Sequence, residues 1–296
     1  MNTDDTNKII SLKNVSYTYA KNTPFAKKAL DDINLDFYSN EYTAIIGATG
    51  SGKSTLIQHL NGLLKPDQGE VLVNGIDTKD KKSQKDLRKK VGLVFQYAQY
   101  QLFEETVYKD IEFGLIKRNI PEDQRKQRVL DTAKMVGLTQ ENLNASPYDL
   151  SGGQKKRAAI AGILVLKPEI LVLDEPAAGL DPEGTRELFS IIQNLHDNKE
   201  CTVILVAHSM ELVAQYAKRV IVLHDSKVVM DGTRDEVFGN VEQLTKLGLD
   251  VPEVTKIMIK LKISHPELND HIYTVSDAKE EILKHINLTK KSNQFK

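Results

Sequence analysis

Hydrophobic and polar residues alternate with a period of two near the start of the chain. The segments IISLKNVSYTY and ALDDINLDFY place apolar side chains at about every second position, which is typical of half-buried antiparallel strands. The next apolar run, YTAIIG, is continuous and ends at a glycine loop. A continuous run is typical of a parallel strand that is buried on both faces. The pattern therefore predicts an antiparallel β region followed by the first strand of a parallel sheet.

The pattern then changes to helical spacing and back. In STLIQHLNGLL the leucines at 56, 60, 63 and 64 recur at helical intervals, which predicts a helix that Pro66 stops. GEVLVNGID predicts another strand with a turn at Asn74 and Gly75, because Asn-Gly is the strongest short hairpin signal. KKVGLVFQ predicts a further buried strand.

A helical insertion is predicted at about 97–166. VYKDIEFGLIKR, PEDQRKQRVLDTAKMVG and SGGQKKRAAIAGILVL read as helices, the second opening with Pro121 at its first helical position. Parallel strands return at EILVLDEP and TVILVAH, with a helix between them, and RVIVLHDSKVVMDG predicts a hairpin. We therefore predict an α/β fold with a mainly parallel core sheet, an antiparallel β subdomain and a helical subdomain.

The composition shifts after about residue 240. VPEVTKIMIKLK places Val254, Ile257, Met258 and Leu261 on one helical face, and SDAKEEILKHI repeats the pattern more weakly. We divide the chain into a domain at 1–240 and a helical tail at 241–296. Because a short isolated helix is marginal in water, this apolar face must pack on something. Its own domain and another subunit are the two alternatives, and we predict a role in subunit association.

Composition excludes several classes of protein. The 296 residues are 40% hydrophobic and 27% charged, and 40 basic residues nearly balance 41 acidic ones, so no basic bias indicates nucleic acid. The single cysteine, Cys201, lies in an apolar run and agrees with a reducing compartment. No signal peptide is evident in MNTDDTNKII, and no apolar run reaches the ~18 residues that span a bilayer. A role at a membrane would therefore require an embedded partner.

The segment GATGSGKST predicts a nucleotide site. It matches the pattern G-x-x-x-x-G-K-[ST] and lies between a buried strand and a helix, as the pattern requires. Its backbone N–H groups converge on phosphate oxygens, Lys53 neutralises phosphate charge, and Ser54 is a ligand for Mg²⁺. The residues we assign to ATP binding in this loop are Gly47, Thr49, Gly50, Ser51, Gly52, Lys53, Ser54 and Thr55.

Polar residues follow three other predicted parallel strands. Asp174 and Glu175 end EILVLDEP, Gln96 ends VGLVFQ and His208 ends CTVILVAH. Ligands of open α/β sheets bind at the carboxyl ends of the strands, so these side chains are expected to meet at the phosphates. We predict Asp174 and Gln96 as Mg²⁺ ligands, Glu175 as the base that accepts a proton from the attacking water, and Gln96 and His208 as further catalytic residues.

A second glycine pair lies in LSGGQKKR, with Ser151 98 residues downstream of Lys53. This segment has a fixed order and spacing relative to the phosphate loop, Gln96, LVLDEP, AGLDP and His208, and that order and spacing are typical of one protein family. Over about 1–240 the chain resembles the nucleotide-binding subunits of ATP-binding cassette (ABC) transporters. An adenylate-kinase-like transferase would share the phosphate loop but not LSGGQ or His208.

The resemblance implies roles that spacing alone does not. Two subunits of this family pair head to tail, so that Ser151, Gly152, Gly153 and Gln154 would bind the γ-phosphate held by the partner's loop. Asp181 of AGLDP would lie at the seam of that dimer. Tyr19 occupies the position of the aromatic ring that stacks on adenine, with Tyr17 as the alternative.

Three longer segments are GATGSGKSTLIQHLNGLLKPDQGEV, FQYAQYQLFEETVYKDIEFG and LSGGQKKRAAIAGILVLKPEILVLDEPAAGLDPEG. They closely resemble energy-coupling factor (ECF) transporters, the prokaryotic importers of vitamins and metal ions. Within them the chain is most similar to the second of two ATPases. This resemblance implies ATP and Mg²⁺ as cofactors and location at the cytoplasmic face of the cell membrane. The implied partners are a second ATPase that is a different paralogue, a transmembrane coupling protein and a substrate-binding membrane protein. No nucleic acid partner is expected.

Two alternative functions stay open. The nearer is the ATPase of a cobalt or nickel importer of the same type. The other is a soluble ABC protein of translation or DNA maintenance, which would usually carry two cassettes, a coiled coil or a basic region. Within QYAQYQLFEE, the resemblance assigns Tyr97, Tyr100, Leu102 and Phe103 to a groove for a helix of the membrane partner, and Glu104 and Glu105 to arginines of that helix. Packing inside the helical insertion is the alternative for these side chains.

Overall fold

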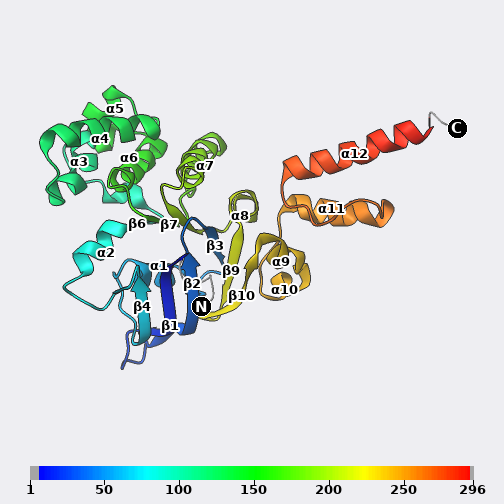
Figure 1. Cartoon of the computed structure of the whole chain (residues 1–296), viewed down its shortest axis with the longest axis horizontal. Coiled ribbons are helices and arrows are strands. Elements are labelled where there is room, and N and C mark those ends of the chain that lie inside the picture. Colours follow the sequence, from blue (N-terminus) through cyan, green and yellow to red (C-terminus); the bar gives the residue numbers. More distant parts are fainter. Residues whose placement is uncertain (1–6, 294–296) are drawn as a thin grey trace.

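The computed structural model describes residues 7–293, and side chains through residue 285. The predicted ranges 1–240 and 241–296 and the start of MNTDDTNKII extend into residues 1–6 and 294–296, which lie outside the described residues. Two sheets organise the chain, as Figure 1 shows. The antiparallel sheet has the order β2-β1-β4-β5 and consists of β1 (Lys8–Tyr19), β2 (Lys27–Tyr38), β4 (Gln68–Val73) and β5 (Ile76–Asp77).

The second sheet carries the site. Its order is β10-β9-β3-β8-β7-β6, with β9, β3, β8, β7 and β6 parallel and β10 antiparallel at one edge. The strands are β3 (Tyr42–Ile46), β6 (Val91–Val94), β7 (Ile170–Asp174), β8 (Thr202–Val206), β9 (Arg219–His224) and β10 (Lys227–Thr233). The predicted α/β fold with a mainly parallel core and an antiparallel β subdomain is confirmed.

Both faces of the parallel sheet are buried, which explains the continuous apolar runs. In β7, Leu171 and Leu173 face one apolar cluster, whereas Ile170 and Val172 face the other. The first cluster lies beneath the helical layer, and the second is shared with the antiparallel sheet. Since successive side chains of a strand point to opposite faces, burial of both faces removes the period of two.

The helices lie around and beside the two sheets (Figure 1). Their bounds are α1 (Lys53–Leu60), α2 (Gln84–Lys90), α3 (Val107–Lys117), α4 (Glu122–Met135), α5 (Gln140–Asn144), α6 (Gly152–Leu164), α7 (Pro182–Asp197), α8 (Met210–Tyr216), α9 (Arg234–Gly239), α10 (Val241–Lys246), α11 (Glu253–Ser264) and α12 (Val275–Asn293), with 3₁₀ turns at Ala98–Gln101 and Pro147–Asp149. Helices α3 to α6 form a separate lobe beside the sheets (Figure 1), in the region predicted as a helical insertion.

Some predicted boundaries were wrong. Helix α1 ends at Leu60, well before Pro66, because Gly62 adopts a left-handed φ of 71° and stops the helix. Pro121 precedes α4 as its cap and is not its first helical residue. Tertiary packing and local glycine conformation decide such ends more than the apolar pattern does.

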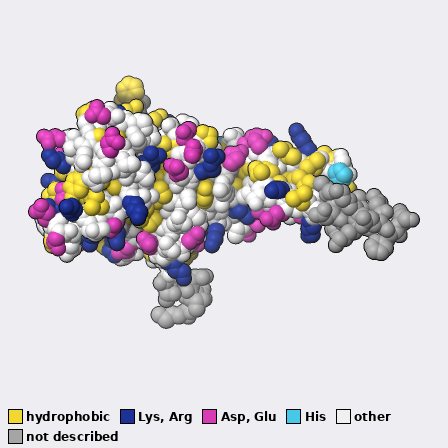
Figure 2. All heavy atoms as spheres, turned by 90° about the horizontal axis from the view of Figure 1, so that it is seen from above, with side chains coloured by type: hydrophobic (Ala, Val, Ile, Leu, Met, Phe, Trp, Pro, Cys, Tyr) yellow, Lys and Arg dark blue, Asp and Glu magenta, His cyan; other side chains and the backbone are white. Residues whose placement is uncertain are grey.

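The tail from α11 onward has an apolar cluster of its own. Met258 is fully buried there with Leu268, Ile272 and Ala278, while Ile257 on the same predicted face is 53% exposed. Residues 241–251 instead contribute side chains to the large core. Figure 2 shows further hydrophobic side chains at the surface of the part that holds α11 and α12. The division at residue 240 and the association role stay predictions.

Within residues 7–293, no helix combines the length and the hydrophobicity that crossing a bilayer requires.

Candidate functional site

The phosphate loop joins β3 to α1, and two of its glycines are required by close packing. A Cβ atom on Gly47 would lie 2.2 Å from the carbonyl oxygen of Leu223, and one on Gly52 would lie 2.3 Å from that of Ala29. Gly52 also has a φ of 107°, which disfavours other residues. Gly52 caps α1 without a side-chain hydrogen bond, so the first N–H groups of the helix remain available to an anion.

Lys53 is folded over this loop. Its Nζ atom donates hydrogen bonds to the carbonyl oxygens of Gly47 at 2.7 Å and Ala48 at 3.0 Å. Burial lowers the pKa of Lys53, and the nearby carboxylates of Glu175 and Asp174 act in the opposite direction. A buried ammonium at a glycine loop, with acids close by, provides the positive charge that a triphosphate requires.

Asp174 is the last residue of β7 and is only 6% exposed. Burial raises the pKa of Asp174, while a hydrogen bond with the side chain of Ser54 lowers it. The structure thus brings together two of the three residues that we predicted as Mg²⁺ ligands, from separate parts of the chain. Their oxygen atoms are of the type that hard cations bind.

Glu175 lies between the two other predicted side chains. Its Oε2 accepts a hydrogen bond from Nε2 of Gln96 at 2.8 Å, and its Oε1 lies 2.9 Å from Nε2 of His208. The backbone of Glu175 has a φ of 47°, an unusual value for a residue with a side chain. Because β6, β7 and β8 are neighbours in the sheet, residues at their carboxyl ends meet here.

Of the two tyrosines considered for adenine stacking, Tyr19 is the more accessible. Its ring is 39% exposed, and its hydroxyl lies 3.2 Å from Oγ1 of Thr55 in the first turn of α1. Tyr17 packs edge to face on the buried His59 and against the apolar cluster under the antiparallel sheet. This geometry favours Tyr19 as the ring beside a nucleotide bound at α1.

The second glycine pair opens α6 in a different part of the molecule. Ser151 caps the helix: its Oγ accepts from the N–H of Gln154 at 3.3 Å, and Oε1 of Gln154 accepts from the N–H of Ser151 at 2.9 Å. Gly152 and Gly153 leave open space at the helix start. Within the described residues, no hydrogen bond or ion pair joins Ser151–Gln154 to the phosphate loop. The exposed helix start is therefore separate from the phosphate loop, and its first N–H groups are of the kind that bind anions.

Other predicted residues have structural duties of their own. Oδ1 of Asp181 accepts from the N–H of Gly184 at 2.7 Å and so caps α7. Tyr97, Tyr100 and Phe103 are 55%, 81% and 61% exposed, whereas Leu102 packs against the core. Glu105 forms an ion pair with Lys109.

Sequence reasoning missed Lys156 of α6. Its side chain is 1% exposed and its Nζ donates to the carbonyl oxygens of Gln96 at 2.7 Å and Ala178 at 3.3 Å. A signal was present, because Lys156 precedes Ile160 by one helical turn and so falls on the core face of α6.

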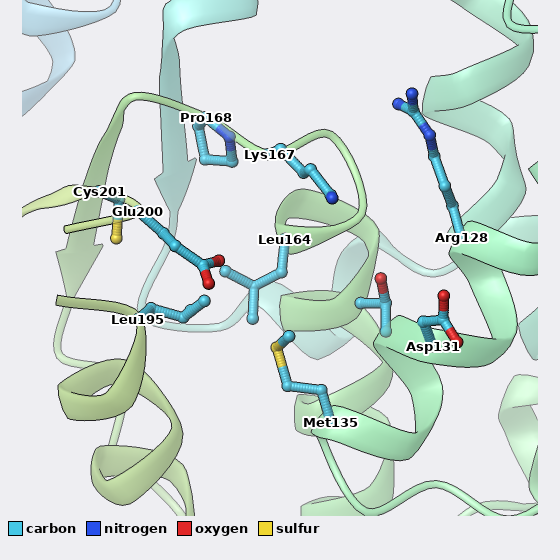
Figure 3. A pocket seen from close by; sticks show the side chains of 10 residues that line it. Arg128, Asp131, Met135, Leu164, Lys167, Pro168, Leu195, Glu200 and Cys201 are labelled. Carbon is cyan, nitrogen blue, oxygen red and sulfur yellow. The ribbon is translucent and has the colours of Figure 1, made fainter. Parts of the chain in front are cut away.

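The cavities do not all coincide with the predicted site. One cavity has a volume of about 480 Å³ and lies between α4 and the core, and none of the predicted site residues lines it. Figure 3 shows Met135 and Leu164 on its walls. A smaller cavity of about 220 Å³ is lined by Glu175, His208 and Phe189. Of the predicted site residues, only Glu175 and His208 line this second cavity.

Comparisons with known proteins agree with this geometry. Residues 30–178 match the ABC transporter family. The chain is 53% identical over 277 residues to the energy-coupling factor transporter ATP-binding protein EcfA2 of Acetivibrio thermocellus, covering 94% of this chain and 98% of that protein.

Two solved structures are similar. One is cbiO1 from Clostridium perfringens, described as part of the ABC transporter complex cbiONQ, with a TM-score of 0.71 and 36% identity over 81% of this chain and 94% of that one. The other is a dimeric ATP-binding cassette in a post-hydrolysis state with ADP and Pi, with a TM-score of 0.70 and 32% identity over 76% of this chain and 99% of that one. The chain therefore belongs to the ABC transporter family, among the ATP-binding proteins of energy-coupling factor transporters.

Proposed function

We propose that this ATPase energises an ECF-type importer of vitamins or related micronutrients, by closing on a second ATPase when ATP binds and separating after hydrolysis. The observation that carries the chemistry is the carboxylate of Glu175, which is held between the side chains of Gln96 and His208 at 2.8 and 2.9 Å. Phosphoryl transfer to water depends mainly on positioning and on charge neutralisation, which this arrangement provides.

In this proposal, each residue of the site has one task. The loop N–H groups and Lys53 bind the phosphates, Tyr19 stacks on adenine, and Glu175 accepts the proton of the attacking water. His208 and Gln96 each fix one carboxylate oxygen of Glu175, so that its remaining lone pairs face the water.

The residues at the loop also fit Mg²⁺. The described part of the chain has no group of three or more His, Cys, Asp or Glu side chains that could hold a metal ion, but Mg²⁺ does not require such a group. Proteins bind this ion through one or two carboxylates together with substrate phosphates, which suits the pair formed by Asp174 and Ser54. Asp174, Ser54 and Gln96 would hold Mg²⁺, and the bound ion would neutralise charge on the β- and γ-phosphates.

Ser151, Gly152, Gly153 and Gln154 act, in this proposal, on the partner's nucleotide. The hydroxyl of Ser151 accepts a hydrogen bond from its own helix and still has its proton to donate to a phosphate oxygen. The exposed glycines allow close approach of an anion to the helix start. Asp181, exposed at the start of α7, would face the same seam.

The remaining proposed partners are a transmembrane coupling protein and a substrate-binding membrane protein, with this chain at the cytoplasmic face. Tyr97, Tyr100 and Phe103 are exposed beside Gln96 and form an aromatic surface suited to a partner helix. Glu104 remains available to a basic residue of that helix, whereas the ion pair between Glu105 and Lys109 would first have to break.

Glu175→Gln in the purified complex tests the chemistry. The substitution keeps size and removes the base, so we expect ATP binding to persist and hydrolysis to fall by about 10²–10⁴-fold. Glu242→Gln is the matched control, because Glu242 is an exposed glutamate on α10. Near-normal turnover by Glu175→Gln would reject the role of Glu175.

A further inference from the structure

Lys156 is a buried ion outside the residues to which a role has been given. Among the lysines in the described part of the chain, only Lys53 and Lys156 are buried, and Lys53 belongs to the phosphate loop. A buried ammonium is costly unless polar groups surround it. Burial lowers the pKa of Lys156, and the negative charge of Glu175 acts in the opposite direction. Its position therefore calls for an explanation beyond packing.

The two acceptors of Lys156 lie in the two segments that flank Glu175. One is the backbone carbonyl of Gln96, whose side-chain amide donates to Glu175. The other is the carbonyl of Ala178, in the loop that leads from Glu175 to Asp181. The N–H of Ala178 also donates to the carbonyl of Glu175 at 3.1 Å. One side chain thus holds the backbone on both sides of the carboxylate.

Lys156 itself belongs to the helix that Ser151 opens. It lies little more than one turn from Ser151, and the intervening backbone is continuous α-helix. Such a short helical segment moves as a rigid unit, so a displacement of the glycine pair displaces the Nζ atom as well. The carbonyls of Gln96 and Ala178 would then follow.

We propose that Lys156 is a positioning residue that links the LSGGQ helix start to Glu175 of the same chain, through the backbone of Gln96 and Ala178. This inference rests on the proposed function and deepens it. When α6 engages the partner's nucleotide, the Lys156 hydrogen bonds carry that movement to the amide of Gln96 and to the loop before Asp181. Closure at one composite site thereby aligns the carboxylate of the other.

The test uses Lys156→Met in the full complex, because methionine keeps the length of the side chain and removes its donors. The control is Lys155→Met in the same helix, where Nζ donates to the carbonyl of Tyr148 at 3.1 Å, outside the site. A misplacement of about 1 Å costs about 10²-fold in rate, so we expect kcat to fall by about 10–100-fold. The KM for ATP should change less than about threefold, because Lys53 and Tyr19 are untouched.

Cooperativity separates this role from a merely structural one. We expect the Hill coefficient for ATP hydrolysis to fall toward one in Lys156→Met and to be retained in Lys155→Met. Lys156→Arg, which keeps the charge and the donors, should recover part of both losses. If Lys156→Met does not assemble, Lys156→Gln keeps an N–H donor in a neutral side chain and should show a smaller loss of the same kind.

Different results would overturn the role of Lys156 and the proposed function. Wild-type kcat and Hill coefficient in a folded Lys156→Met or Lys156→Gln complex, while Glu175→Gln is inactive, would overturn only the role of Lys156. Normal turnover by Glu175→Gln would overturn the proposed chemistry whatever Lys156 does. A lower Tm with unchanged kcat and Hill coefficient would assign Lys156 to stability alone and so also overturn the inference.

Discussion

Gly153→Asp tests whether the second glycine pair acts on the partner's nucleotide. The structure indicates that the substitution itself is tolerated. A Cβ atom on Gly153 would have Leu180 Cδ2 at 3.8 Å as its nearest neighbour, an ordinary contact. Gly153 lies in the first turn of α6, where an acidic side chain stabilises a helix by about 0.3–1 kcal/mol. The free energy of unfolding of the chain should therefore stay the same or rise slightly.

The expected loss is electrostatic and appears only on closure. A carboxylate on residue 153 would face the γ-phosphate bound to the partner. Two like unit charges about 4 Å apart repel by about 4 kcal/mol at an effective dielectric constant of about 20, or about a thousandfold in equilibrium constant. ATP affinity at this chain's own loop should change little, because Lys53 and Tyr19 hold that nucleotide.

The assay places Gly153→Asp in this chain only and measures ATP affinity at each phosphate loop separately, with the other loop disabled. Gly153→Asn is the control, since it has the same shape without the charge. We expect Gly153→Asp to prevent ATP-driven closure at the partner's loop and Gly153→Asn to impair that closure much less. Loss of ATP at the loop of Lys53, with the partner's loop unaffected, would refute the reasoning. Equal effects of Asp and Asn would refute its electrostatic part.

Two further predictions concern the nucleotide and pH. Tyr19→Ala should weaken ATP binding by about 1–3 kcal/mol, the usual value of base stacking. Tyr17→Ala should mainly lower Tm, because Tyr17 packs on the buried His59. Equal ATP affinities in titrations of Tyr19→Ala and wild type would contradict the stacking role. Burial raises the pKa of Asp174, so the folded state binds the carboxyl proton of Asp174 more tightly than the unfolded state does. The stability that this proton contributes is present at low pH and is lost as pH rises through the folded pKa. Asp174→Asn should therefore raise the Tm of nucleotide-free protein at about pH 8 while ATP hydrolysis is lost, and a lower Tm would show that the charged form is not disfavoured.

Much of the fold was readable from residue patterns. The period of two in β1 and β2, the continuous runs of β3, β7 and β8 and the helical spacing of α6 indicated whether one face, both faces or one stripe of each element is buried. Helix ends were less readable. The end of α1 depends on a left-handed Gly62, and the pattern of leucines continues past it.

The sequence by itself determined which chemical groups are present and which strand end each one follows. Their order and spacing were enough to indicate the phosphate loop, the acids of β7 and the second glycine pair. Only the tertiary structure decided which atoms meet: that Glu175 lies between Gln96 and His208, and that a lysine of α6 is buried against two carbonyls. The reason is that strand order in the sheet and the docking of α6 are set by long-range packing, which the local periodicity of a chain does not encode.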